Sequence, residues 1–337
     1  MNALVLDTVP IWTVILGFGV FLYVLLDGFD LGVGMLFGLA PDTPSRNLVM
    51  NSIAPIWDGN ETWLVLGGLA LLAAFPLAFA IIIPAVYFPI LVMLLALVFR
   101  GVAFEFRYRD AEHKTFWDFG FVYGSAIATF AQGVVLGSFI QGFEVEGRAF
   151  TGRSFDFLTP FSLLCGVSLV PGYALLGTTW LMMKTDGAVE KHARRLAQPL
   201  FTAMMACIVV VSIWSPLMSE RIAERWFSWP NILFLSWVPG VTALVAWSCW
   251  HGIRKNKVYQ PFISAVALFL LAYVGLVISN VPYLVPPSMT VWQAAAHPSS
   301  QLFMLIGVCL LLPLILGYTV FVYWMFRGKV RHGEGYH

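Results

Sequence analysis

The chain has 337 residues, of which 59% are hydrophobic and only 11% are charged. A soluble domain is typically about one quarter charged, so this composition excludes a soluble globular protein and indicates a polytopic membrane protein. The formal net charge of +1 gives no reason to expect a nucleic-acid partner. The four cysteines stand singly, with no CxxC motif, which argues against an iron–sulfur cluster or a covalently attached haem.

Apolar runs long enough to cross a membrane follow one another along the whole chain. A membrane-spanning helix needs about 20 mainly apolar residues. Nine runs meet this need: Val9–Leu39, Ser52–Phe75, Phe79–Phe99, Phe119–Phe143, Leu158–Met183, Pro199–Met218, Ile232–Trp250, Pro261–Tyr283 and Ser300–Phe326. We therefore predict an all-α membrane protein with nine transmembrane helices, forming a single integral membrane domain over residues 1–337.

Lysine and arginine are distributed unevenly between the loops that join these runs. One set of loops and helix ends holds most of them: Arg46, Arg100, Arg107, Arg109, Lys114, Lys184, Lys191, Arg194, Arg195, Arg254, Lys255, Lys257, Arg327, Lys329 and Arg331. The alternating set holds Arg148, Arg153, Arg221 and Arg225. Because basic loops stay on the cytoplasmic side, we predict a periplasmic N-terminus and a cytoplasmic C-terminus, which requires an odd number of spans.

The first run contains two acids and several glycines in the stretch "LLDGFDLGVGML". Asp27 and Asp30 are three residues apart, so both lie on one face of a helix. The glycines are spaced in two small-xxx-small pairs, Gly28 with Gly32 and Gly34 with Gly38. This spacing lets another helix approach closely, which favours a packed interface over a lipid-facing surface. The run is also no cleavable signal peptide, since it is too long and has no basic start.

The second run begins with "PIWDGNETWL", in which Asp58 and Glu61 again share a helix face. An acid near the middle of a bilayer costs roughly 2.5–3.5 kcal/mol, so such residues usually have a function or a buried partner. The third run ends in "LVFRGVAFEFRYRD". Here Arg100 is predicted to anchor the helix and to pair with an acid, and Glu105 pairs with Arg109 if the helix continues.

These carboxylates allow two interpretations. In the first, Asp58, Glu61, Asp27, Asp30 and Glu105 form a proton pathway from the cytoplasm, because buried carboxylates exchange protons. In the second, they hold helix ends, backbone amides or an arginine across an interface and carry no protons. The residues themselves leave both interpretations open.

The histidines give no sign of a haem or metal site within the spans. His113, His192, His251, His297, His332 and His337 all fall in loops or at helix ends. No span carries a pair of histidines facing inward, so bis-histidine haem ligation is not expected in this chain. Any redox chemistry is therefore expected in a partner, and we predict no catalytic residue and no metal here.

Three motifs together resemble one known family. "LLDGFDLGVG" at 25–34, "PIWDGNETWL" at 55–64 and "FRGVAFEFR" at 99–107 are similar to subunit II of the cytochrome bd family of bacterial quinol oxidases, which includes cyanide-insensitive terminal oxidases. The resemblance implies two four-helix bundles plus one peripheral helix. It also implies a subunit of an electrogenic quinol oxidase that reduces O2 to water, with Asp58 at the start of a proton route.

The resemblance further implies which cofactors and partners to expect. Subunit II is haem-free and supports assembly of subunit I, which carries haem b and haem d or a b-type substitute. Quinol and O2 are the substrates of the complex, which lies in the bacterial cytoplasmic membrane. A structural quinone in this chain and a small single-helix accessory subunit also occur in the family. The alternative outside the family is a proton- or cation-coupled secondary transporter, although the acids cluster in the first third of the chain without a counterpart later.

Overall fold

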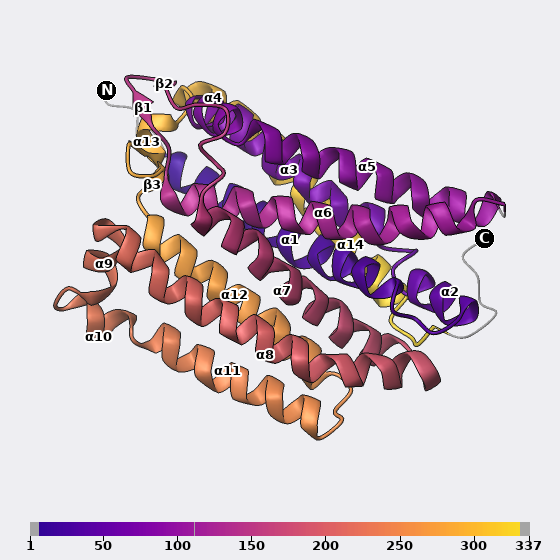
Figure 1. The fold of residues 1–337 in the computed structure, drawn as a ribbon. Helices are drawn as coiled ribbons and strands as arrows, with labels where there is room; N and C mark the ends of the chain where they lie inside the picture. The colour runs from indigo at the N-terminus through magenta and orange to yellow at the C-terminus, as the bar shows by residue number, and fades with distance from the viewer. Residues whose placement is uncertain (1–6, 111, 331–337) are drawn as a thin grey trace.

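The computed structural model describes residues 7–110 and 112–330, which form long, roughly aligned helices and two small hairpins (Figure 1). The helices are α1 Val9–Phe37, α2 Thr43–Asn51, α3 Trp57–Ala74, α4 Pro76–Ala85, α5 Tyr87–Arg109, α6 Lys114–Gln141, α7 Pro160–Lys184, α8 Gly187–Met218, α9 Glu220–Phe227, α10 Asn231–Leu235, α11 Trp237–Arg254, α12 Gln260–Asn280, α13 Val291–Ala294 and α14 Pro298–Met325. The antiparallel hairpins pair β1 Val145–Glu146 with β2 Ala149–Phe150, and β3 Tyr283–Val285 with β4 Met289–Thr290.

Among the described residues, eight helical segments are long and apolar enough to cross a membrane: α1, α5, α6, α7, α8, the continuous pair α10 and α11, α12 and α14. The prediction of an all-α membrane protein is therefore confirmed. Helix α3 occupies the second predicted run but does not join this set, because the polar residues of "WDGNET" lower its mean hydropathy. The exact number of spans stays a prediction.

The predicted boundaries of the third run are wrong. The run Phe79–Phe99 was expected to be one helix, but α4 ends at Ala85 and α5 begins at Tyr87. The reason is Pro89, which has no N–H to donate to the carbonyl of Ala85, so a continuous helix would leave that carbonyl unpaired. The spanning helix thus starts later and continues to Arg109, ten residues beyond the predicted end.

A proline also separates α3 from α4. Pro76 cannot donate to the carbonyl of Leu72, and the chain bends at Phe75. The bend leaves the carbonyl of Ala74 without its usual helical partner. This carbonyl accepts instead from Gln301 Nε2 at 3.0 Å and from the Ala296 amide at 2.9 Å, which ties the last helix to the end of α3.

Helix α1 is central and packs against α3, α6 and α7. The glycines of its second half face α6 and α7 so closely that a Cβ at Gly32 would overlap the carbonyl of Tyr173, and one at Gly34 would overlap the Ser125 hydroxyl. Gly177 of α7 meets the backbone of Gly32 in the same way. The predicted close helix approach is therefore confirmed.

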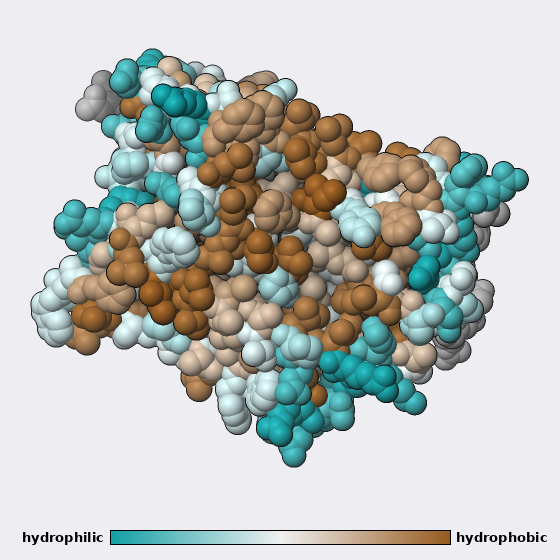
Figure 2. Space-filling view, in the orientation of Figure 1, coloured by the Kyte–Doolittle hydropathy of each residue, from teal (hydrophilic) through white to brown (hydrophobic). Residues whose placement is uncertain are grey.

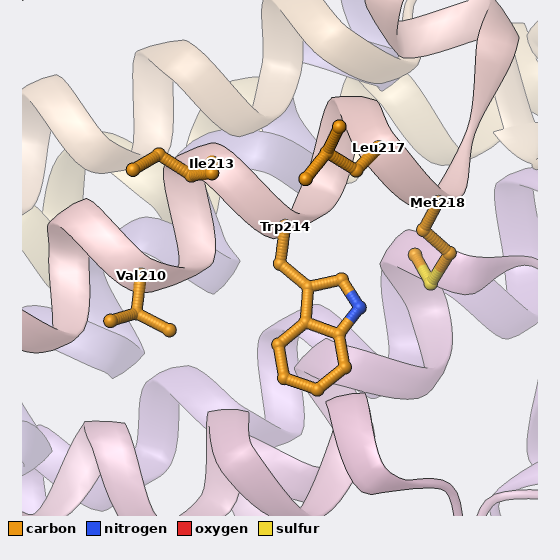
Figure 3. A pocket seen from close by; sticks show the side chains of 5 residues that line it. All are labelled: Val210, Ile213, Trp214, Leu217 and Met218. Atoms are coloured by element: carbon orange, nitrogen blue, oxygen red, sulfur yellow. The ribbon is translucent and has the colours of Figure 1, made fainter.

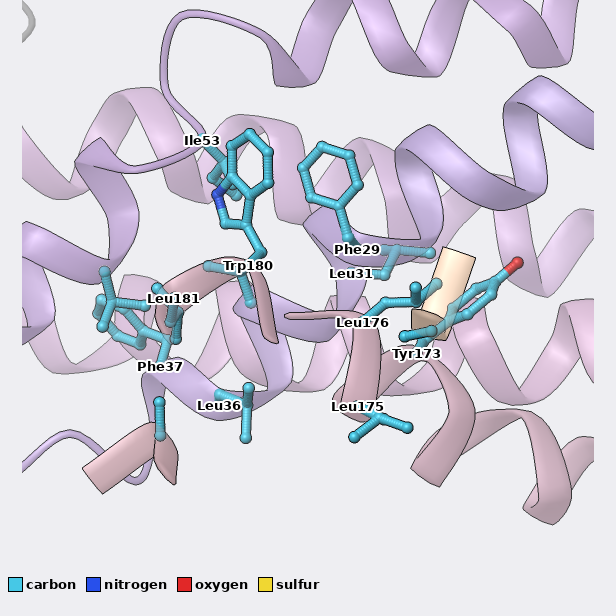
Figure 4. Close-up of a cluster of buried hydrophobic side chains, with 14 of the residues drawn as sticks. Phe29, Leu31, Leu36, Phe37, Ile53, Tyr173, Leu175, Leu176, Trp180 and Leu181 are labelled. Carbon is cyan, nitrogen blue, oxygen red and sulfur yellow. The ribbon is translucent and has the colours of Figure 1, made fainter. Parts of the chain in front are cut away.

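Large apolar side chains fill the space on either side of this crossing (Figure 4). Phe29 of α1 and Trp180 of α7 stack with their ring centroids 4.4 Å apart, and both are buried. The indole N–H of Trp180 donates to the carbonyl of Ser52 at 3.3 Å, so the connection between α2 and α3 is attached to the same core. This packing fixes α1, α3 and α7 relative to one another.

The two ends of the molecule differ in composition from its middle. Figure 2 shows brown, hydrophobic side chains across the middle of this face and teal, hydrophilic ones at both ends. One end carries β1 to β4, α9, α10 and α13, and the opposite end carries α2 and the loops that hold most of the lysines and arginines (Figure 1). The predicted alternation of basic and non-basic loops therefore matches the two ends of the fold, apart from Arg100, which lies buried inside α5, while Arg331 lies outside the described residues.

Candidate functional site

A buried ion pair joins α1 to α5. Arg100 Nη1 lies 3.2 Å from Asp27 Oδ1, and each side chain is only 1% exposed. The same nitrogen lies 3.7 Å from Glu61 Oε2 of α3, whose side chain is 29% exposed. The guanidinium also stacks over the ring of Trp57, with its carbon 5.8 Å from the ring centroid. Arg100 thus connects two acids from different helices.

Asn60 links the second acid of α1 to the last helix of the chain. Its Nδ2 donates to Asp30 Oδ2 at 2.7 Å, and its Oδ1 accepts from the Tyr323 hydroxyl of α14 at 2.9 Å. Asn60 is 1% exposed and Asp30 is fully buried. The amide therefore satisfies one acceptor and one donor in a region shielded from bulk solvent.

A third group of polar side chains extends from the acids toward α6 and α7. The Tyr173 hydroxyl donates to Gln132 Oε1 at 2.8 Å, and Gln132 Nε2 donates to the Tyr23 hydroxyl at 2.7 Å. Tyr23 precedes Asp27 by four residues and therefore lies on the same face of α1. Hydrogen-bonding groups thus follow one another from α7 through α6 to the acids of α1.

Two of the residues expected on the proton pathway lie outside this cluster. Asp58 is exposed and starts a stripe on α3 that continues through Val65 and Leu69, which are 59% and 57% exposed. Glu105 is exposed as well. Although α5 continues past it as the predicted pairing with Arg109 requires, no ion pair between these two residues forms among the described residues. The fold thus brings together Asp27, Asp30, Glu61 and Arg100 and leaves Asp58 and Glu105 on the surface of the isolated chain.

A separate charged cluster lies at the basic end of the molecule, between α2, α5 and α6. Arg107 of α5 and Arg46 of α2 both pair with Asp118 of α6, the latter at 3.0 Å. Arg107 Nη1 also donates to Asn47 Oδ1 at 2.8 Å, and its side chain is fully buried. These contacts attach α2 to α5 and α6 and give the cluster a structural role.

Asp110, which follows α5, lies beside this cluster. It accepts a hydrogen bond from Trp117 Nε1 at 3.1 Å and another from the His113 amide at 3.1 Å. These bonds, with that of Trp117 the strongest, favour the ionised carboxylate and hold the pKa of Asp110 below its usual value.

Five uncharged residues that were not predicted from the sequence also bond within the site: Tyr23, Asn60, Gln132, Tyr173 and Tyr323. Two signals were available in the sequence. Asn60 lies inside the motif between Asp58 and Glu61, and Gln132 is an amide in the middle of an otherwise apolar run. Tyrosine is common in membrane helices and gave no comparable signal.

The described histidines and an apolar groove on α8 both lie apart from these acids. His113, His192, His251 and His297 lie at helix ends or just before them, and His332 and His337 lie outside the described residues. Within the described ranges, no three His, Cys, Asp or Glu side chains could together hold a metal ion. A groove of about 450 Å³ is lined by Val210, Ile213, Trp214, Leu217 and Met218 of α8 (Figure 3). It has only apolar side chains and lies away from the acids.

Comparison with known proteins relates this chain to one family. The family described as cytochrome bd terminal oxidase subunit II matches residues 9–326. The chain is 29% identical to cytochrome bd-I ubiquinol oxidase subunit 2 of Escherichia coli K12, covering 95% of this chain and 94% of that one. It is 30% identical to cytochrome bd ubiquinol oxidase subunit 2 of Bacillus subtilis 168, covering 92% and 93%.

The fold agrees with this relationship. The structure of bd oxidase from Geobacillus thermodenitrificans contains a chain that superimposes with a TM-score of 0.76 at 16% identity, covering 96% of this chain and all of that one. At that identity the likeness concerns the fold alone. Since the family match covers nearly the whole chain, the protein belongs to the cytochrome bd terminal oxidase subunit II family.

Proposed function

We propose that this chain is the haem-free subunit II of a bacterial quinol oxidase and that it delivers cytoplasmic protons for the reduction of O2 to water. The subunit I partner would hold haem b and haem d, or a b-type substitute, where quinol oxidation supplies electrons to O2. This chain would support the assembly of that partner. The described histidines lie at helix ends, which supports the assignment of the haems to the partner.

We further propose how the helices of this chain lie in the bacterial cytoplasmic membrane. Helix α3 would be the ninth span, and α1, α3, α5 and α6 would form one four-helix bundle and α7, α8, α11 and α12 the other, all within one membrane domain. Helix α14 would be peripheral, which fits the large exposure of its side chains. The concentration of basic residues at the α2 end supports a cytoplasmic C-terminus and a periplasmic N-terminus.

One observation carries the functional part of the proposal: an ionisable residue stands on an apolar outer face, next to a buried acidic cluster. Asp58 begins the stripe that continues through Val65 and Leu69. A carboxylate that faced lipid there would be unfavourable, with a cost that reaches roughly 2.5–3.5 kcal/mol at the middle of a bilayer. A partner subunit packed on this face would remove that cost and enclose Asp58 between two proteins.

Glu61 would then connect this interface to the interior. It follows Asp58 by three residues, and its side chain is 29% exposed, whereas that of Asp27, the other acid paired with Arg100, is 1% exposed. A proton that arrives at Asp58 could pass to Glu61 and from there to Asp27 or Asp30, or along the interface toward the partner. In this scheme Glu105 would contribute negative charge at the cytoplasmic mouth, and Arg100 would hold the acids in place.

An Asp58→Asn variant tests the route. We expect the complex to assemble with its full haem content, and its O2 consumption with quinol to fall by about tenfold or more, which corresponds to about 1.4 kcal/mol in the barrier. Thr62→Ala is the matched control, since Thr62 is exposed on the same face one turn later and its hydroxyl donates to the nearby carbonyl of Gly59. Normal turnover of a fully haem-loaded Asp58→Asn complex would contradict a proton role for Asp58 and favour a structural one.

The same preparation checks the assignment to an oxidase. A stoichiometric larger partner and haem bands in a reduced-minus-oxidised visible spectrum are expected. A well-folded but haem-free preparation without that partner would instead favour the transporter alternative. The structural quinone and the small accessory subunit remain expectations of the family resemblance.

A further inference from the structure

The acids that meet between α1 and α3 carry more negative charge than the positive charge that reaches them. Asp27 and Asp30 are buried and Glu61 is 29% exposed, and in the described part of the chain Arg100 is the single cation paired with any of them. If all three acids were ionised, the cluster would carry a net charge of −2 among apolar helices. Uncompensated charge is strongly disfavoured in such a medium, and buried groups usually bind a proton instead.

The two acids of α1 differ in their partners. Asp27 lies 3.2 Å from the guanidinium of Arg100, which stabilises its ionised form. Asp30 receives a hydrogen bond only from the neutral amide of Asn60, at 2.7 Å, and forms no ion pair among the described residues. Its side chain is completely buried, and its Oδ1 has no hydrogen-bond partner in the described part of the chain.

Asn60 is the one described donor that bonds to the Asp30 carboxyl group. Its Nδ2 lies 2.7 Å from Asp30 Oδ2 and 3.5 Å from the carbonyl of Leu26, which also accepts from the Asp30 amide within α1. No described donor is left for Oδ1, so an ionised Asp30 would keep one charged oxygen buried and unpaired. A protonated Oδ1 carries no charge and avoids most of that cost.

We propose that Asp30 is held as a neutral carboxylic acid that stores one exchangeable proton, while Asp27 is held ionised by Arg100. On release, the O–H bond of Asp30 breaks and the proton passes to the carboxylate of Glu61, directly or through water. The reverse step refills Asp30 from Glu61. Other ionisable groups facing this region are the phenols of Tyr23, Tyr173 and Tyr323, which stay neutral at physiological pH.

This inference deepens the proposed function, because it names the acid that holds the proton within the delivery route. It also makes Asp27 and Asp30 unequal although they stand three residues apart on one helix. The difference arises from their neighbours, a cation for Asp27 and an amide for Asp30, and so it is open to a direct spectroscopic test.

Infrared spectroscopy of the purified complex of this chain with its partner subunit provides the test. A protonated carboxyl group has a C=O band that is separate from ionised carboxylate bands and moves on transfer to D2O. We expect Asp30→Asn to lose one such band relative to the unmodified complex. Asp27→Asn, the matched control one turn earlier, should lose none. Retention of every protonated-carboxyl band in Asp30→Asn would overturn the proposal, as would loss of one in Asp27→Asn alone.

A second variant keeps the test decisive if Asp30→Asn fails to assemble. Asn60→Leu removes the amide that donates to Asp30 Oδ2, so the Asp30 band should move to higher frequency. Labelling the aspartates with carbon-13 shifts this band and leaves those of glutamates in place. An Asn60→Leu spectrum in which no labelled band moves would mean that Asp30 is ionised.

Turnover separates this inference from the proposed function. If Asp30→Asn loses its band and consumes O2 at the normal rate, the stored proton exists and the delivery route does not pass through it. If the unmodified complex shows no band of a protonated Asp30 while Asp58→Asn still slows O2 consumption, the delivery route stands and storage on Asp30 is wrong. The spectrum and the rate therefore decide the two proposals independently.

Discussion

Arg100 supplies the positive charge that faces Asp27 and Glu61. Its side chain is 1% exposed and reaches acids from two other helices. Its Nε and Nη2 have no partner in the described part of the chain, as is true of Asp27 Oδ2. Internal water commonly satisfies such atoms. The site therefore combines the ion pair with Asp27 at 3.2 Å, the longer contact with Glu61 at 3.7 Å and polar atoms that internal water can satisfy.

Removal of Arg100 should therefore be more harmful than removal of the whole ion pair. Arg100→Gln leaves the buried Asp27 carboxylate without a counter-charge, and breaking a buried pair in this way typically costs about 3–5 kcal/mol of stability. Thermal unfolding of the detergent-solubilised complex measures the loss. The double variant Asp27→Asn with Arg100→Gln buries no unpaired charge at this pair and should regain much of the stability. Equal losses in the single and double variants would show that the pairing is not responsible.

The sequence identified the charged members of the site and missed the uncharged ones for a physical reason. Asp27, Asp30, Glu61 and Arg100 stand out because a charge within an apolar run is costly and therefore rare. The Asn60 amide costs less, and its partner on α14 is 263 residues away in the chain. No local pattern can indicate that contact.

The three-residue spacing of Asp58 and Glu61 also predicted similar surroundings for the two side chains, which the structure does not show. Three residues advance a helix by about 300°, which leaves the two side chains about 60° apart around the axis. That difference places Asp58 on the outer face, whereas Glu61 reaches Arg100. Two residues three apart can therefore differ in burial when the boundary between core and surface runs between their side chains.

At the scale of elements, the crossing of α1 and α7 is set by glycines and gives a sharp prediction. Gly32→Ala should prevent the helices from reaching their present separation, because the added Cβ would overlap the backbone of Tyr173, which cannot move aside as a side chain could. We expect the yield of assembled complex and its melting temperature to fall markedly.

Gly68→Ala is the matched control for this prediction. Gly68 lies inside α3, and a Cβ there would meet no atom within 4 Å. Alanine is about 1 kcal/mol more favourable than glycine in a helix interior, so this variant should be neutral or slightly stabilising. If both variants assemble and melt alike, close packing at Gly32 is not limiting.

Helices themselves were easier to predict than their ends. All nine predicted runs contain helix, because long apolar composition is a strong signal. Proline gave an ambiguous signal for boundaries: Pro76 and Pro89 accompany breaks, whereas Pro199 lies inside α8, which begins at Gly187. Tertiary contacts decide whether a carbonyl that loses its helical partner at such a break finds another one. The carbonyl of Ala74, at the bend before Pro76, finds Gln301.

At the scale of the whole molecule, the charge difference between the two ends predicts the orientation in the membrane. Thr43 at the α2 end and Ser228 at the α9 end are both exposed, and either can become cysteine with little change in size. In a chain whose four native cysteines are replaced by alanine, a membrane-impermeant maleimide should label Ser228→Cys from outside the cell. Thr43→Cys should react only after the membrane is opened. The opposite pattern of labelling would reverse the proposed topology.

The contacts of α14 have a consequence for the order in which the protein is made. Thr8 donates to Gln301 at 2.7 Å, Trp12 donates to the Gln301 carbonyl at 3.1 Å, and Tyr323 meets Asn60. These partners on α1 and α3 leave the ribosome long before α14 does. Until the final helix inserts, polar groups of the first two long helices must rely on water, lipid headgroups or an assembly factor. These groups are therefore covered only after α14 has packed against α1 and α3.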